Sequence, residues 1–188
     1  MKSILISIQP KWCELIASGR KTIEVRKTKP KIAIPFKCYI YMTDNKKQVL
    51  SLLDNPTPYW ETLHFGKGKV IGEFVCDKIG TDRTFGHDVS FYAEARMSDV
   101  DIASYCVNPE MYCWHISDLV IYDKPKELRE FIIFCPEWEK GYFDYKCMHC
   151  KHYFCNDSDM RHECTVEGEI PITRPPQSWC YVSEAEYE

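Results

Sequence analysis

Two positive side chains and one negative side chain, those of Lys21, Arg26 and Glu24, lie within six positions near the start of the sequence. Residues 19–26 read GRKTIEVR, and from position 22 polar and apolar residues alternate, which predicts a β-strand over 22–26. In a strand, Thr22, Glu24 and Arg26 project from one face, and Ile23 and Val25 enter the core from the other. The spacing therefore predicts a polar surface beside a buried one.

The chemistry of these side chains suits recognition of an anion or a nucleobase. Arg26 offers a planar fork for a phosphate or a base edge, and Lys21, at the turn before the strand, offers a point charge or a nucleophilic amine. Glu24 can hold Arg26 in place, accept a hydrogen bond from a base amino group, or act as a base. The simpler interpretation from spacing alone is an ordinary strand with a surface ion pair, worth ~0–1 kcal/mol.

The elements around this segment predict a small β-rich fold. Strands are expected over 3–8, 22–26, 36–43, 70–78 and 111–122, and short helices over 11–18, 46–53, 98–106 and 125–131. Gly19 is expected to end the first helix in a left-handed conformation. Short strands, long connections and few helices predict a mixed α+β, mainly β fold: a small closed or half-open β-barrel with short rim helices.

Composition and charge limit the classes of function. Of 188 residues, 45% are apolar and 14% aromatic, which argues against global disorder. No run approaches the roughly 18 apolar residues of a membrane span, and the first residues are too soon broken for a secretory signal. We therefore expect a cytoplasmic protein with no membrane partner. Residues 1–47 hold 11 Lys and Arg against 3 Asp and Glu, which predicts either a surface for an anionic partner or a solvated lysine face.

A resemblance to a known family adds to these inferences. Gly19, Lys21, Glu24 and Arg26 reproduce the G-x-K-x-x-E-x-R signature of the ASCH family, within the PUA-like superfamily of small barrels. Residues 68–74 (GKVIGEF), residues 114–119 (WHISDL) and the following Lys124-Pro125 also resemble this family, so the likeness covers about residues 1–131. It implies a barrel whose cleft binds RNA, other nucleic acid or a modified nucleobase.

The resemblance also implies candidate site residues. An exposed Trp114 could stack on a base, although most aromatic residues are core, and strand alternation places His115 and Ser117 on its opposite face. The predicted ligand-binding residues are Lys21, Thr22, Glu24, Arg26, Trp114, His115 and Ser117.

Some members of the family resemble N4-acetylcytidine amidohydrolases or ribonucleases, which implies an enzymatic alternative. In the amidohydrolase type the lysine matching Lys21 is the proposed nucleophile, and a threonine stands where this chain has Glu24. A neighbouring carboxylate stabilises the ammonium and is expected to raise the pKa of Lys21, which disfavours a nucleophile. Binding is therefore the first hypothesis, and Lys21 and Glu24 are catalytic only if the chain is an enzyme.

The eleven cysteines fall into two groups. Six are scattered over residues 1–146, mostly among apolar neighbours, and are predicted to be small buried hydrophobes. The spacing C-x2-C-x4-C-x8-C at 147–164 predicts a structural zinc (Zn2+) site, with free thiols or disulfides as the alternative. The first choice of ligands is Cys147, Cys150, Cys155 and Cys164, with Cys180, His149, His152 and His162 as possible substitutes.

These observations predict two parts: an ASCH/PUA-like barrel over 1–135 and a cysteine-rich, zinc-stabilised tail over 136–188. Two prolines at 175 and 176 favour an extended segment, and Trp179 is expected to anchor it against the barrel or the metal module. The identity of the ligand and the oligomeric state are left open.

Overall fold

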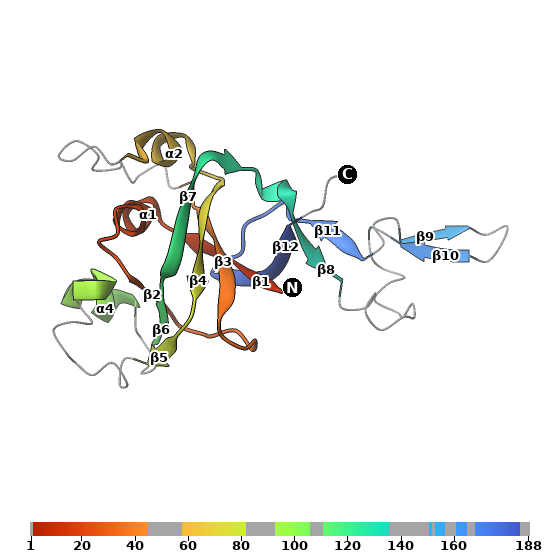
Figure 1. Ribbon diagram of the computed structural model, residues 1–188. Helices are drawn as coiled ribbons and strands as arrows, with labels where there is room; N and C mark the ends of the chain where they lie inside the picture. Colours follow the sequence, from red (N-terminus) through yellow and green to blue (C-terminus); the bar gives the residue numbers. More distant parts are fainter. Residues whose placement is uncertain are drawn as a thin grey trace.

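A computed structural model describes residues 2–44, 58–81, 93–105, 111–135, 151, 153–156, 161–164 and 168–184 (Figure 1). Within these ranges the chain is mainly β with few helices. The strands are β1 (Ser3–Ile8), β2 (Ile23–Arg26), β3 (Phe36–Met42), β4 (Val70–Cys76), β5 (Ile79–Thr81), β6 (Tyr112–His115), β7 (Ser117–Lys126), β8 (Phe131–Phe134), β9 (Tyr153–Asn156), β10 (Arg161–Cys164), β11 (Glu169–Pro171) and β12 (Trp179–Glu184). The helices are α1 (Pro10–Ala17), α2 (Trp60–Phe65), α4 (Asp99–Tyr105) and the 3-10 turn η1 (Leu128–Glu130).

A seven-stranded sheet forms the centre of the molecule, in the order β11-β8-β12-β1-β3-β4-β7 (Figure 1). Every residue of strand β1 is buried. The isoleucines of its SILISI sequence project from one face, and Leu5 projects from the other between two serines. One face packs on a core that includes Ile16 of α1 and Leu63 of α2, and the other packs on a smaller cluster around Tyr39 and Phe131. The central strands β1 and β3 are therefore covered on both sides.

A second sheet carries the segment that the sequence singled out. It has three strands in the order β2-β6-β5, and only Ile116 separates its strand β6 from β7 of the large sheet. The backbone N–H of Ile116 donates to the carbonyl of Thr22 at 2.9 Å. The bend at Ile116 therefore joins the two sheets.

The sequence predicted a closed or half-open barrel, and no closed barrel is found among the described strands. The large sheet ends at β11 and β7, and the small sheet ends at β2 and β5, so no ladder joins β2 to β1 or β12. Side chains bridge this interval instead: Arg26 donates to the carbonyl of Ser7, and the indole N–H of Trp179 donates to Thr28. We call this interval, between residues 24–28 on one side and residues 7–8 and 177–179 on the other, the seam.

The C-terminal segment contributes to the large sheet. Strand β12 pairs antiparallel with β1, and β11 pairs with β8, so residues 168–184 return to the sheet formed by the N-terminal part. Trp179 packs against Trp114, with ring centroids 6.0 Å apart, which matches the expected anchoring. The division at residue 135 stays a prediction for the intervening residues, of which the structure describes only Lys151 and the hairpin of β9 and β10.

Several local predictions agree with the structure. Gly19 has φ +70° after α1, and α4 lies within the helix expected over 98–106. At the start of α4, the side chains of Ser98 and Asp101 accept from each other's backbone N–H groups. Helix α2 was missed, and the helix expected over 46–53 lies outside the described residues. Four of the scattered cysteines, Cys13, Cys38, Cys76 and Cys113, are buried as expected. Within the ranges given above, no helix has the length and apolar character needed to span a membrane.

Candidate functional site: a cleft at the seam

A cleft of about 880 Å³ opens at the seam. Its lining comes from the end of β1 and the start of α1, from Lys21, from β2 and the two residues after it, and from the two residues after β3. Four residues within 97–105, together with Gln177 and Ser178, complete it. We call it the seam cleft. Its volume is within the range of pockets that hold small ligands.

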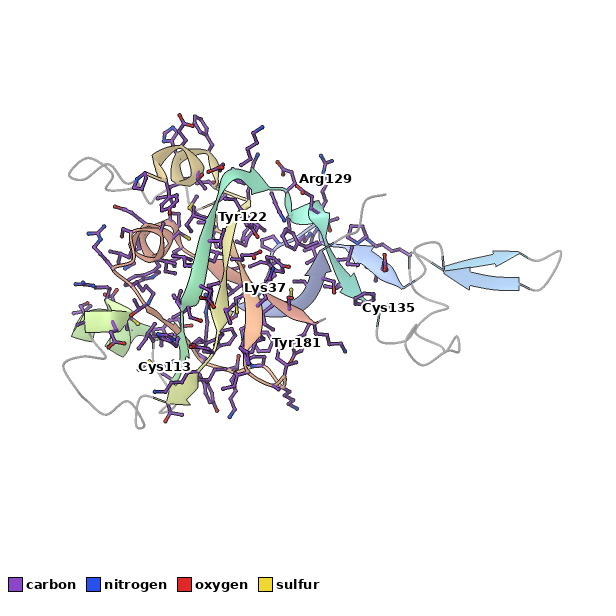
Figure 2. The ribbon with its side chains drawn as sticks, in the orientation of Figure 1. Lys37, Cys113, Tyr122, Arg129, Cys135 and Tyr181 are labelled. Carbon is purple, nitrogen blue, oxygen red and sulfur yellow. The ribbon has the colours of Figure 1, made fainter. Side chains whose placement is uncertain are left out.

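The local fold explains why the charged face of β2 lines this cleft. Ile23 and Val25 pack with Ala95 and Cys113 in a separate small core beneath the small sheet, where Figure 2 shows Cys113 on β6. Side chains alternate along a strand, so Glu24 and Arg26 face the other way, toward the large sheet. The predicted assignment of the two faces of β2 is therefore correct.

Lys21, Glu24 and Arg26 converge at the floor of the seam cleft. Arg26 Nη2 lies 2.9 Å from Glu24 Oε1, and Lys21 Nζ lies 3.5 Å from Glu24 Oε2. Only 2% of the Lys21 side chain and 7% of the other two are exposed. The surface ion pair considered in the sequence is instead a buried triad, with one carboxylate between two cations.

Further hydrogen bonds fix the orientation of this triad. Lys21 Nζ donates to the carbonyl of Ala95 at 2.7 Å, and Arg26 Nη2 donates to the carbonyl of Ser7 at 2.7 Å. Arg26 Nη1 lies 3.4 Å from both the carbonyl and the hydroxyl oxygen of Ser178. The buried Nε of Arg26 has no hydrogen-bond partner within the described residues. Each cation is thus held by backbone oxygens as well as by the carboxylate.

The expected direction of the Lys21 pKa was wrong. Burial lowers the pKa of Lys21 from its ordinary 10.5, and this effect outweighs the opposing influence of Glu24, which was the only one considered from the sequence. The reason is that desolvation penalises the ammonium of a lysine with almost no exposed side chain. The lysine is therefore easier to deprotonate than an exposed one.

Cations and aromatic rings stand together at the mouth of the cleft. Lys11 Nζ lies 4.1 Å from the centroid of the Trp12 ring, and Lys27 Nζ lies 4.8 Å from that of Tyr105. Lys11 also pairs with Asp101 of α4 at 3.1 Å, so an ion pair connects α1 and α4 at this mouth. Among the described lining residues, four are cationic and three are carboxylates, which gives a slight positive balance.

Four predicted site residues do not line the cleft. Thr22 lies just before β2, where its backbone N–H donates to the carbonyl of Glu94. Trp114 is fully buried in the main core, edge-on to Phe36 with ring centroids 5.7 Å apart, and cannot stack on a ligand. Trp114 is on the face of the small sheet that Glu24 shares, but its end of that face packs in the core between the two sheets and does not reach the cleft.

His115 and Ser117 are engaged elsewhere. His115 Nδ1 lies 2.6 Å from Asp77 Oδ1 at the surface, and this hydrogen bond lowers the pKa of Asp77. The Ser117 hydroxyl donates to the carbonyl of Val75 at 2.9 Å. The partner of His115 lies between β4 and β5, and the partner of Ser117 lies on β4, so neither side chain is directed to the seam cleft.

The sequence did not point to Ser7, Gln177 or Ser178. These residues come from the end of β1 and the segment before β12, which meet only through the pairing of strands far apart in the sequence. No motif marks them. The proposed zinc ligands Cys147 and Cys150 lie outside the described residues, together with His149 and His152.

Cys155 lies on β9 with His162 as its backbone partner on β10, and Cys164 ends β10. In the part of the chain that the structure describes, no group of three or more His, Cys, Asp or Glu residues could hold a metal ion. Cys180, a possible substitute ligand, lies on β12, where burial raises the pKa of its thiol to about 11. The zinc site therefore stays a prediction.

Comparisons with known proteins give one family model and several similar solved structures. The model of the ASCH domain matches residues 6–114. Among solved structures, a serine-to-alanine mutant of ZmASCH from Zymomonas mobilis has a TM-score of 0.51 at 18% identity, and covers 95% of this chain and 87% of its own. A tyrosine-to-phenylalanine mutant gives 0.47 at 21% (68% and 77% covered), and ASCH from the same organism gives 0.46 at 20% (95% and 86%). No curated protein matches the chain.

Proposed function

Because this chain belongs to the ASCH domain family, which is generally thought to bind RNA, we propose that the seam cleft receives a base of a single-stranded RNA. The observation that carries the proposal is the buried triad of Lys21, Glu24 and Arg26 at the floor of an 880 Å³ cleft. These three charges stand where a ligand in the cleft would meet them.

The mouth, or rim, of the cleft supplies the two interactions that single-stranded nucleic acid requires: positive charge for the phosphates and aromatic rings for the bases. Lys11 and Lys27 offer charge to phosphates, and they lie over the rings of Trp12 and Tyr105. Bases stack on such rings with about 1–3 kcal/mol each, and every base has a face that can stack. The ligand would therefore lie with its backbone along the rim and one base in the cleft.

The triad at the floor of the seam cleft favours a ligand that presents hydrogen-bond acceptors. Two cations and one carboxylate leave a net positive charge, and Glu24 already accepts from Arg26 and lies against Lys21. A base presents carbonyl and ring-nitrogen acceptors to such donors. The modified nucleobases suggested by the family resemblance remain ligands of the same site, because acylation adds another carbonyl oxygen.

Salt dependence of binding tests the electrostatic part of the proposal. A fluorescent 12-mer RNA titrated by anisotropy should bind less tightly as salt rises, and Lys27→Ala should reduce the slope of log K against log salt by about 0.7. The control Lys37→Ala removes a charge from β3 outside the cleft (Figure 2) and should leave the slope unchanged. If both substitutions reduced the salt slope equally, the RNA would be bound only by the overall positive charge of the protein and not by the seam cleft.

Two tryptophan substitutions test the stacking part. Trp12→Ala should weaken RNA binding by about tenfold, since a stacked base contributes about 1–3 kcal/mol. Trp114→Phe should leave the affinity within twofold, because Trp114 is buried away from the cleft lining. A folded Trp12→Ala protein with unchanged affinity would contradict stacking on this ring.

A second candidate function is hydrolysis of an acylated cytidine, and one observation favours it. Burial lowers the pKa of Lys21, which makes its amine more available as a nucleophile toward an acyl carbon. Incubation with N4-acetylcytidine should then release cytidine, and Lys21→Arg should abolish the release, because a guanidinium is not a nucleophile at neutral pH. Absence of cytidine by chromatography after prolonged incubation would exclude this activity.

A further inference from the structure

The segment Pro176–Ser178 forms one wall of the seam cleft through Gln177 and Ser178. It lies outside residues 6–114, which match the family model, and precedes β12. The wall is therefore supplied by a part of the chain that the family match does not cover.

This wall is fixed on both sides of Gln177. The Ser7 hydroxyl donates to the carbonyl of Pro176 at 2.6 Å, and the Ser7 backbone N–H donates to the carbonyl of Ser178 at 2.9 Å. Arg26 Nη1 also approaches both oxygens of Ser178. A backbone held at both neighbours fixes where the side chain between them starts, so only the rotamers of Gln177 remain to be ordered on binding.

Gln177 is an exposed polar side chain of the cleft that these contacts leave available. It is exposed, lines the cleft, and forms no hydrogen bond with another described residue. Its neighbours are committed: Glu24 is held between two cations, and Ser178 accepts from Arg26. A primary amide is both a donor and an acceptor, so it can match the edge of a base that carries both.

We propose that Gln177 is a specificity-determining residue, whose side-chain amide hydrogen-bonds the edge of the base in the seam cleft. The inference rests on the proposed function, because it assumes that RNA enters this cleft. Buried cations and stacking rings hold any base, whereas an amide distinguishes bases by their pattern of donors and acceptors. Ser7 and Ser178 act as positioning residues for this amide.

The test compares the affinity of the purified full chain for the 12-mer RNAs A12, C12 and U12 by fluorescence anisotropy. The wild-type protein should prefer one oligonucleotide over the weakest by about fivefold or more, as expected for one amide contact. Gln177→Leu, which keeps the size but removes donor and acceptor, should bring the three affinities within twofold of each other. The matched control Thr173→Val, on the same exposed segment but outside the cleft lining, should keep the wild-type preference.

The outcomes separate this inference from the proposed function. If the wild-type protein binds RNA and Arg26→Lys weakens binding, but Gln177→Leu keeps the same preference, the role of Gln177 is wrong and the cleft assignment stands. Equal wild-type affinities for the three oligonucleotides would also overturn the inference. Failure of the wild-type protein to bind any of them at low salt would overturn both. Circular dichroism confirms that each variant is folded.

Discussion

The ammonium of Lys21 and the carboxylate of Glu24 lie 3.5 Å apart, and at most 7% of either side chain is exposed. The other oxygen of the same carboxylate is 2.9 Å from Arg26 Nη2. One buried anion therefore lies between two buried cations, and the excess positive charge is met by uncharged oxygens, among them the Ala95 carbonyl and the Ser178 hydroxyl. This imbalance governs how the site responds to substitution and to pH.

Glu24→Gln should destabilise the fold strongly. The amide leaves two buried cations without their anion, and breaking a buried pair in this way costs about 3–5 kcal/mol. The free energy of unfolding in urea measures the loss. Glu169→Gln, which removes an exposed carboxylate on β11, is the control and should leave the urea midpoint unchanged. A Glu24→Gln protein as stable as the wild type would show that water reaches the triad freely.

The titration of Lys21 should make the free energy of unfolding increase as the pH rises. Its pKa in the folded state lies below the ordinary 10.5 because of burial, so between these two values the unfolded chain binds more protons than the folded one. Raising the pH through this window therefore favours folding. Urea unfolding between pH 8 and 10.5 should show a steeper rise for the wild type than for Lys21→Met. Parallel curves for the two proteins would contradict the burial of the ammonium.

Removing the carboxylate at the mouth of the cleft should strengthen RNA binding. Asp101 pairs with Lys11 at 3.1 Å, and Asp101→Asn would release that lysine to a phosphate and remove a repulsive charge. Both partners are partly exposed, so we expect a gain of about two- to threefold at low salt that disappears at high salt. Asp77→Asn removes a surface carboxylate outside the cleft lining and should have no effect. A gain of RNA affinity in both variants would indicate that only the net charge of the protein matters, and not the position of Asp101 at the cleft.

We propose that the cysteine-rich segment holds a structural zinc through Cys147, Cys150, Cys155 and Cys164. Elemental analysis of the purified protein should then find about one zinc per chain, because four protein ligands form a closed tetrahedral site. Cys150→Ser should lose the metal, and Cys135→Ser, which removes a half-buried thiol outside the motif, should retain it. Zinc-free wild-type protein purified without chelators would contradict the site.

Strand periodicity was sufficient to separate the two faces of β2. Ile23 and Val25 are buried, and Glu24 and Arg26 face the seam, because side chains alternate in any strand regardless of what surrounds it. The same periodicity could not predict that the charged face is buried as well. That depends on the large sheet and on Ala95, which cover the triad from elsewhere in the chain.

The errors at Trp114 and the omission of Gln177 have the same origin. Trp114 is the cross-strand partner of Glu24 and so shares its face, but one end of that face opens into the cleft and the other into the core. Gln177 reaches the site only because β12 pairs with β1. Local sequence contains neither fact, since both depend on how the two sheets are placed against each other.

The contacts between Arg26 and Ser178 join positions 152 residues apart, which has a consequence for the order of folding. Contacts between such distant positions require a large loop to close and therefore form slowly. We expect the hydrophobic strands β1, β3 and β4 to assemble first, with the guanidinium still hydrated. Competence to bind would then appear in a late kinetic phase, after most of the secondary structure is already in place.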